Sequence, residues 1–344
     1  MRDEHEERSV RAIVQEQHGG PEVLVSREID RPGIGDRDVL VRVHAAGLHI
    51  GDVFGVRGSP FPVRFTSGLR GPKFGVPGSD IAGTVEATGR AVTRFAPGDE
   101  VFGLCSWPSS GACAEYARAD EDKLIGKPSG LSFEQAAAIP TSASAALHGL
   151  REAGRLRAGQ KLLINGASGG VGTYAVQIAR AFGAEVTGVC GPTNVELVRS
   201  LGAHHVIDYT REDFTRGTAR YDVILDNMEN HSLADTRRAL APDGTLVLMS
   251  GTGASGLGLL VRLIRPVVMS PFVKHSLRRP LSNPKREDLE VLTAMVEKGA
   301  LRPVIDGTYP LSEVAAALHY IEAGHARGKV VVTMKQDQTQ DRGS

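Results

Sequence analysis

Strand-like and helix-like segments alternate between residues 161 and 250, and this alternation restricts the fold more than any other feature of the chain. Short apolar runs typical of strands occupy residues 161–165, 185–190, 205–209, 221–226 and 245–250. Helical patterns occupy residues 171–182, 195–201 and 233–240, and the first of them places its apolar residues on one face. Strands that alternate with helices predict a parallel sheet with helices on both faces, an α/β fold.

The N-terminal part of the chain, from residue 10 to residue 120, has a different pattern and is rich in Gly, Pro and Val. Strand-like runs at residues 39–45, 81–87 and 100–104 alternate with turn signals. Several short strands at close spacing predict an antiparallel, barrel-like domain. After Pro284, helices are expected over residues 286–298 and 311–323, and strands over 304–305 and 330–333. This final portion is expected to return to the first domain and complete it.

Charge and cysteine content exclude several classes of partner. The 344 residues include 40 basic and 40 acidic ones, and this balance gives no argument for nucleic acid or an anionic membrane. Three cysteines (105, 113 and 190) make no disulfide framework, and the first eight residues lack the apolar stretch of a signal peptide. The apolar segment 256–273 contains Arg262 and Arg265, so a lid-like or buried helix is expected rather than a membrane span. We therefore expect a cytoplasmic protein.

A glycine-rich loop, Asn165-Gly-Ala-Ser-Gly-Gly-Val-Gly172, joins the first strand of the alternating region to its first helix. Residues without a Cβ allow the backbone to turn tightly and to approach a pyrophosphate. The N–H groups at the start of the helix then point at the anion. A glycine-rich turn without a ligand has the same appearance, but the alternating pattern around it favours dinucleotide binding.

The end of the second strand bears on the choice of nucleotide. An Asp or Glu at this point holds the ribose 2′-hydroxyl of NAD, whereas here the strand ends in Cys190 and Gly191. Nothing there repels a 2′-phosphate, which favours NADPH over NADH. Tyr209 and Lys329 are expected to reach that phosphate if the fold brings them close.

Several motifs together resemble the medium-chain dehydrogenase/reductase superfamily, and within it the zinc-less quinone oxidoreductase branch. They include Val39-Leu-Val-Arg-Val-His-Ala-Ala-Gly47, Pro77-Gly-Ser-Asp-Ile-Ala-Gly83, the glycine loop, and residues 19–24, 94–103, 202–208 and 325–331. The resemblance implies a GroES-like catalytic domain formed by residues 1–131 and 284–344, with a Rossmann domain, 132–283, between them. It also implies a homodimer or homotetramer.

The same resemblance implies the residues around the cofactor. They are Thr141, Gly166, Ser168, Gly169, Gly170, Val171, Gly172, Cys190, Gly191, Tyr209, Asn227, Met228, Gly251, Thr252 and Lys329. The branch transfers hydride from NADPH to quinones, and related branches reduce activated alkenes such as enones. The expected partner is therefore a small apolar acceptor.

No metal site is expected. Zinc-dependent relatives place a Cys at the position of His49 and a His-Glu pair at Ser79-Asp80, with a further Cys near residues 142–144. Here only His49 and Asp80 can act as ligands, so a three-ligand catalytic site is not assembled. Without a metal a carbonyl is harder to polarise, which favours conjugated acceptors.

His49 and Asp52 are the candidate catalytic residues, in a loop that the resemblance places against the nicotinamide. His49 can donate a hydrogen bond to a developing oxyanion or deliver a proton. A structural hydrogen bond by His49, and a loop-orienting role for Asp52, are the alternatives. Water is another possible proton source. His49, Phe54, Phe61 and Phe65 are expected to line the substrate pocket.

Two other functions remain open at this point. One is a zinc-less carbonyl reductase or alcohol dehydrogenase. The other is a non-catalytic NADPH-binding protein, because a fold by itself does not establish catalysis.

Overall fold

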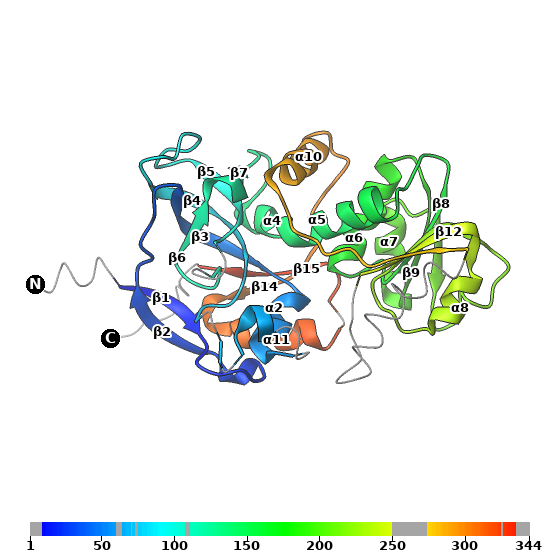
Figure 1. Cartoon of the computed structure of the whole chain (residues 1–344), viewed down its shortest axis with the longest axis horizontal. Coiled ribbons are helices and arrows are strands. Elements are labelled where there is room, and N and C mark those ends of the chain that lie inside the picture. The colour runs from blue at the N-terminus through cyan, green and yellow to red at the C-terminus, as the bar shows by residue number, and fades with distance from the viewer. Residues whose placement is uncertain are drawn as a thin grey trace, which may run out of the picture. The chain divides into compact units, whose positions relative to one another are not determined.

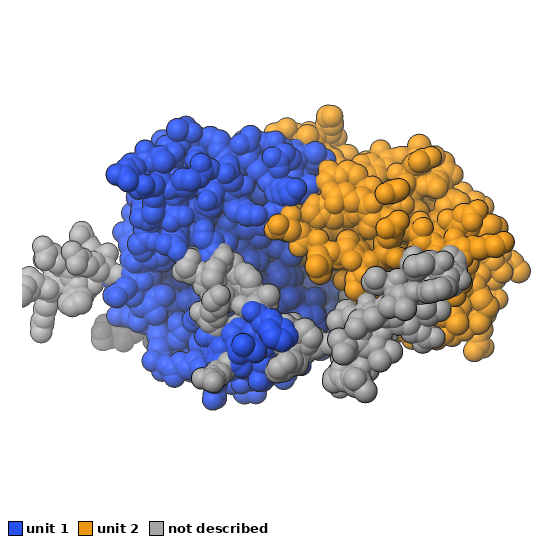
Figure 2. All heavy atoms as spheres, viewed as in Figure 1, with its two compact units in different colours: residues 1–141, 284–293, 305–344 blue, residues 142–283, 294–304 orange. Residues whose placement is uncertain are grey.

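The computed structural model describes residues 9–59, 64–69, 71–72, 75–106, 111–249, 274–324 and 326–334 (Figure 1). The chain divides into two compact units, coloured separately in Figure 2. Unit 1 comprises residues 1–141, 284–293 and 305–344, and unit 2 comprises residues 142–283 and 294–304. None of the helices in the described part of the chain is long and apolar enough to cross a membrane.

Unit 1 contains a seven-stranded sheet in the order β14-β15-β3-β4-β5-β7, with β6 paired to β3. Its strands are β3 (Asp38–Leu48), β4 (Asp80–Thr88), β5 (Glu100–Leu104), β6 (Tyr116–Asp120), β7 (Leu124–Gly126), β14 (Ile305–Pro310) and β15 (Lys329–Thr333). All neighbours are antiparallel except β14 and β15. Because β15 pairs with β3, the C-terminal segment adds strands to the sheet of the first domain.

The remaining elements of unit 1 pack around this sheet. They are β1 (Ser9–Val14) paired with β2 (Val25–Asp30), η1 (Pro21–Val23), α2 (Ile50–Arg57), α3 (Arg64–Ser67), η3 (Glu121–Lys123), α4 (Phe133–Ala137), η7 (Leu311–Glu313) and α11 (Val314–Glu322). In the hydrophobic core, alternate residues of the strands, such as Val39, Val41 and Val43, pack in one cluster with Val314 and Leu318 of α11. This alternation is the period-two pattern that predicted the strands.

Unit 2 contains a six-stranded parallel sheet in the order β10-β9-β8-β11-β12-β13. The strands are β8 (Lys161–Asn165), β9 (Glu185–Cys190), β10 (His205–Asp208), β11 (Tyr221–Asp226), β12 (Leu240–Leu248) and β13 (Ser276–Arg278). From β8 the chain adds β9 and then β10 on one side of the sheet, and it then returns to add β11, β12 and β13 on the other side. The carboxyl ends of β8 and β11 are therefore the topological switch point. The doubly wound arrangement is confirmed, although β13 was not predicted.

The helices of unit 2 are α5 (Pro140–His148, which begins in unit 1), η4 (Gly149–Ala153), α6 (Gly170–Ala181), η5 (Pro192–Asn194), α7 (Val195–Ser200) and α8 (Leu233–Arg238). Helix α10 (Arg286–Glu297) passes from unit 1 into unit 2. Eight consecutive residues of α6, from Gly172 to Ala179, are buried. Tyr174 among them is fully buried, which matches its expected packing role.

The compact units differ from the predicted domains in two places. Helix α4 lies in unit 1, because it packs on β3, β4, β5 and β15. Residues 294–304 lie in unit 2, where the side chain of Gln177 accepts a hydrogen bond from the N–H of Arg302 and donates one to its carbonyl oxygen.

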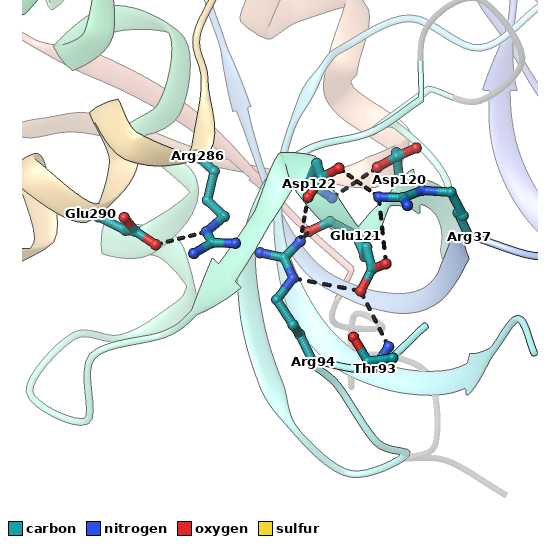
Figure 3. A network of polar contacts seen from close by, with 8 residues as sticks. All are labelled: Arg37, Thr93, Arg94, Asp120, Glu121, Asp122, Arg286 and Glu290. Atoms are coloured by element: carbon teal, nitrogen blue, oxygen red, sulfur yellow. Dashed lines mark hydrogen bonds and ion pairs between the residues drawn. The ribbon is translucent and has the colours of Figure 1, made fainter. Parts of the chain in front are cut away.

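A buried carboxylate fixes the turn between β6 and β7 in unit 1 (Figure 3). The side chain of Glu121 lies between the guanidinium groups of Arg37 and Arg94, at 3.6 and 3.5 Å. It also accepts a hydrogen bond from the N–H of Thr93. Both arginines reach Asp122 as well. Since a buried charge requires compensation, this network holds the turn in one conformation.

Candidate active site

The loop between β8 and α6 forms a tight backbone turn at the switch point of unit 2. Gly166 has φ +78°, in the left-handed region that favours glycine. The N–H groups of Gly166 and Ala167 donate to the carbonyl oxygen of Val189, at 3.1 and 2.9 Å. These bonds tie the loop to the end of β9.

The first turn of α6 packs directly against this loop. An ideal Cβ at Gly172 would lie 2.1 Å from the carbonyl oxygen of Gly166, so only glycine fits. The N-cap residue is Gly169, and no side chain of the described residues caps the first turn. The N–H groups of Gly170, Val171 and Gly172 lie in that turn, where a helix offers no internal acceptor. The geometry fits a diphosphate at the helix N-terminus.

The carboxyl end of β11 supplies polar atoms next to the loop. The side-chain amide of Asn165 donates to Asp226 at 2.8 Å, which joins the ends of two neighbouring strands. The amide of Asn227 donates to the carbonyl oxygen of Asn165, while its own Oδ1 is buried and has no partner among the described residues. The side chain of Met228 lies against Gly166. Because this buried oxygen of Asn227 lies beside the glycine loop, it could accept a hydrogen bond from the ribose or the nicotinamide group of a bound cofactor.

The end of β9 forms the other side of this site. The hydroxyl of Tyr209 would lie 3.3 Å from a Cβ at Gly191, and its side chain is 62% exposed. Asn194 donates to the hydroxyl of Ser168, and its buried Oδ1 has no partner in the described structure. Asn194 was not among the predicted residues. The one sequence feature that could have indicated it is its position two residues after Pro192, in the turn that follows β9. Cys190 is buried, and burial raises the pKa of its thiol to about 11.

The structure therefore brings together most of the predicted cofactor residues of unit 2. Gly251 and Thr252 lie outside the described residues. Asn165, Asp226 and Asn194 were missed as site residues, because their roles depend on partners from other strands. The amides of the loop, Asn227 and Asn194 are the groups that would hold a nicotinamide dinucleotide.

Unit 1 contains the second cluster, which is centred on His49. His49 is the N-cap of α2: its Nδ1 accepts a hydrogen bond from the N–H of Gly51 at 3.0 Å. The carboxylate of Asp52 accepts from the N–H of His49 at 2.8 Å, so the two residues form a capping box. The Nε2 atom of His49 lies 3.2 Å from the hydroxyl of Ser79. Both side chains thus have a structural role, which was the alternative reading of the sequence.

A buried ion pair lies behind His49. Asp80 is fully buried and accepts hydrogen bonds from the N–H and the hydroxyl of Thr141, at 3.1 and 2.5 Å, and from Ser79 at 3.2 Å. The ammonium of Lys329 donates to the carbonyl oxygen of Leu48 at 2.8 Å and lies 3.9 Å from Asp80.

The geometry gives Lys329 and Thr141 partners within unit 1. Lys329, which was expected to reach the 2′-phosphate if the fold brings them close, is only 2% exposed, and its ammonium donates to the carbonyl oxygen of Leu48. Both donors of Thr141 are directed to Asp80, a contact that the sequence did not indicate.

Burial dominates the electrostatics of this cluster. It raises the pKa of Asp52, against the opposing effects of His49 and its backbone N–H. Burial also lowers the pKa of Lys329, against the attraction of Asp80 and Asp52. The cluster therefore holds its charges at a cost in solvation that the hydrogen bonds to Leu48 and Thr141 offset.

The predicted pocket residues are described only in part. Phe54 is half-buried on α2, Phe65 is 69% exposed, and Phe61 lies outside the described residues. His49 is partly exposed, with 19% of its side chain accessible.

Residues 35–141 match the family model described as alcohol dehydrogenase GroES-like domain, and residues 201–332 match the model described as zinc-binding dehydrogenase. The chain is 33% identical over 327 residues to a mitochondrial NAD(P)H oxidoreductase of Mus musculus, covering 86% of this chain and 82% of that protein. It is 31% identical over 332 residues to the quinone oxidoreductase of Rattus norvegicus, covering 93% and 96%.

Solved structures agree with these relatives. The quinone oxidoreductase from Coxiella burnetii superimposes with a TM-score of 0.84 at 30% identity, covering 95% of this chain and 100% of that one. The enoyl reductase CurK superimposes with a TM-score of 0.81 at 25% identity, covering 95% and 99%.

Proposed function

Because the chain belongs to the medium-chain dehydrogenase/reductase superfamily, in its quinone oxidoreductase-like branch, we propose that it transfers a hydride from NADPH to a quinone or an activated alkene without zinc. The protein is an NAD(P)H-dependent oxidoreductase, and its relatives indicate a small-molecule substrate. What we propose beyond this is that the hydride donor is NADPH and that the acceptor is a quinone or an activated alkene.

The observation that carries the proposal is the helix N-terminus left open by the glycine loop. The amides of Gly170 to Gly172 and the orphaned Oδ1 of Asn227 lie at the carboxyl ends of β8 and β11. This is where dinucleotides bind in doubly wound sheets. When bound there, the nicotinamide supplies the hydride.

The choice of NADPH rests on the end of β9. No carboxylate occurs from Cys190 to Asn194. The nearest one on the adjacent strand, Asp208, already accepts hydrogen bonds from the N–H and the hydroxyl of Thr210. The exposed hydroxyl of Tyr209 beside Gly191 is a donor available to a 2′-phosphate.

The metal-free reaction is supported by how His49 and Asp80 are already engaged. Nδ1 of His49 accepts from Gly51, and the carboxylate of Asp80 accepts from Thr141 and Ser79. In place of a Lewis acid, a conjugated acceptor spreads the charge that arrives with the hydride onto an enolate or hydroquinone oxygen. One proton then completes the reduction.

His49 is proposed to donate a hydrogen bond to that oxygen. Since its Nδ1 accepts a hydrogen bond from a backbone N–H, the neutral ring carries its proton on Nε2. The Nε2–H group now faces the hydroxyl of Ser79, which also accepts hydrogen bonds and donates to Asp80. The capping bond fixes the tautomer and the direction of this donor.

A cofactor-oxidation assay with matched panels tests the proposal. Simple quinones, enones and saturated ketones are each supplied with NADPH and then with NADH, before and after treatment with a strong zinc chelator. Turnover of quinones or enones with NADPH that survives the chelator is expected. Turnover of ketones alone, or activity lost on chelation and restored by zinc, would contradict the proposal. Tight NADPH binding without any turnover would make the chain a non-catalytic binder.

A further inference from the structure

A second buried ion pair lies in unit 2, close to the proposed cofactor site. The guanidinium of Arg279, the residue after β13, donates to both carboxylate oxygens of Glu229 at 2.9 and 2.7 Å. The side chains of Arg279 and Glu229 are 13% and 3% exposed. Bidentate geometry of this kind is directional as well as strong. The pair joins the end of β13 to the turn that follows β11, although β12 lies between these strands.

Glu229 has a backbone conformation that is unfavourable for its residue type. Its φ is +49°, in the left-handed region where a Cβ crowds the following carbonyl group. Such strain persists only where surrounding contacts determine the conformation. The bidentate ion pair with Arg279 is a contact that holds the side chain of Glu229 in this conformation.

The turn that contains Glu229 also holds two cofactor-site residues in place. The carboxylate of Asp226 accepts hydrogen bonds from the N–H groups of Met228 and Glu229, at 3.1 and 2.8 Å, and from the side chain of Asn165. The N–H of Asn227 donates to the carbonyl oxygen of Asn165. These bonds direct Asn227 and Met228 toward the glycine loop, where Met228 contacts Gly166.

We propose that Arg279 is a positioning residue for the cofactor: by pairing with Glu229 it keeps the turn of residues 226–230 in its left-handed form, and so sets the places of Asn227 and Met228 beside Gly166. Loss of Arg279 removes the bidentate cationic partner of a buried carboxylate. Glu229 then turns toward water, and the hydrogen bonds of Met228 and Glu229 to Asp226 open. The inference rests on the proposed function only in requiring that a nicotinamide dinucleotide binds at this loop.

The test compares three variants of the full chain. Arg279→Gln removes the pair. Arg279→Gln with Glu229→Gly removes the pair and the buried charge, while glycine adopts the same φ without strain. Arg278→Gln is the matched control, because Arg278 is the preceding arginine and is exposed. Dissociation constants for NADPH and NADH are measured by fluorescence titration, and backbone hydrogen exchange over residues 226–230 is followed in the ligand-free proteins.

A misplaced turn is expected to raise the dissociation constant of the Arg279→Gln variant about tenfold and to speed exchange in the turn. The double variant is expected to recover both properties, and Arg278→Gln to resemble the wild type. Unchanged affinity and exchange in Arg279→Gln, whatever its melting temperature, would overturn the inference. A double variant as defective as the single one would also overturn it. If Arg279→Gln does not fold, Glu229→Gly alone is used: retained affinity and exchange support the left-handed turn, and their loss contradicts it.

Cofactor binding by the wild type shows whether the proposed function itself is wrong, independently of the variants. If the wild type binds NADH and not NADPH, the proposed cofactor is wrong, and the variants are compared with NADH. The exchange measurement needs no cofactor, so it tests the turn in either case.

Discussion

The carbonyl oxygen of Gly166 lies 2.1 Å from the point that a Cβ of Gly172 would occupy. No side-chain atom fits at that distance, so the first turn of α6 can pack this closely on the glycine loop only because residue 172 has no side chain. The close approach aims the amides of the helix N-terminus at the space above the loop. The two glycines thus act together, one through its left-handed φ and the other through its missing side chain.

Gly172→Ala is therefore expected to weaken NADPH binding at least tenfold, because the added methyl group separates the helix from the loop. Gly172→Asp adds a carboxylate facing the diphosphate and is expected to abolish binding. Fluorescence titration measures both. Gly130→Ala is the control, because a Cβ at Gly130 meets no atom within 4 Å. Wild-type affinity in Gly172→Asp would mean that the cofactor binds elsewhere.

The glycine loop and its flanking elements were predictable because they depend on local sequence. Residues 161–165 form an apolar run followed by glycines and a helical pattern, and the structure has β8 and α6 at those positions. Strand β13, with only three residues, has no pattern that separates it from a loop. Its pairing with β12 depends on residues far along the chain.

The polar clusters were less predictable, since their members are distant in sequence. Asp80 and Lys329 are 249 positions apart, and nothing near either residue indicates the other. The N-cap role of His49 was equally hidden, because histidine is not among the favoured N-cap residues. The family resemblance led to the catalytic prediction for His49 and Asp52, with a structural role as the alternative, and the structure shows the capping bonds that such a structural role requires.

His49→Ala is expected to lower turnover roughly 100-fold, in the range for loss of one hydrogen-bond donor to a developing oxyanion. NADPH affinity is expected to change little, because His49 contacts Gly51, Asp52 and Ser79 within unit 1, whereas the glycine loop lies in unit 2. Steady-state kinetics and titration separate the two quantities.

The variant His49→Asn supplies the control for this prediction. Its side-chain oxygen can still cap α2, so the helix should remain intact. The amide also keeps an N–H donor, so the decisive outcome is that of His49→Ala: if its turnover equals that of the wild type, His49 acts as a cap and not as a donor to substrate.

Asn194→Asp is expected to reverse the preference for NADPH. The substitution keeps the size of the side chain and places a carboxylate next to Ser168, where it repels a 2′-phosphate and accepts a hydrogen bond from a 2′-hydroxyl. The ratio of the NADPH and NADH dissociation constants should rise about tenfold or more, since like charges at close range cost over 1 kcal/mol. An unchanged ratio would place the ribose away from Asn194.

The stability of unit 1 is expected to depend on the protonation of His44. Its ring stacks on Phe133 at 4.3 Å and contacts the hydroxyl of Thr84. Burial, and then Arg42, lower the pKa of His44 below its usual 6.5, although Glu100 and Glu134 oppose the shift. The unfolded chain therefore binds more protons than the folded one just below that pH, and stability falls as the pH is lowered through it.

Replacing His44 by Gln removes this titration and keeps a hydrogen-bonding side chain. The difference in unfolding free energy between the wild type and His44→Gln should be constant above the usual histidine pKa. Below that pH it should move in favour of the variant. Urea unfolding at a series of pH values measures the difference. A difference that does not change with pH would show that His44 has the same proton affinity in both states.

The buried pair of Lys329 and Asp80 gives a prediction about stability. Lys329→Met leaves the fully buried Asp80 without its cation and should destabilise the protein by about 3 kcal/mol, as is usual when one partner of a buried pair is lost. Adding Asp80→Asn removes the remaining charge and keeps an acceptor for Thr141, so the double variant should be more stable than Lys329→Met. Urea unfolding of the two variants measures this. If the double variant instead lost the sum of the unfolding free energies that the two single substitutions cost, Lys329 and Asp80 would be independent. The 3.9 Å contact between them would then carry no coupling energy.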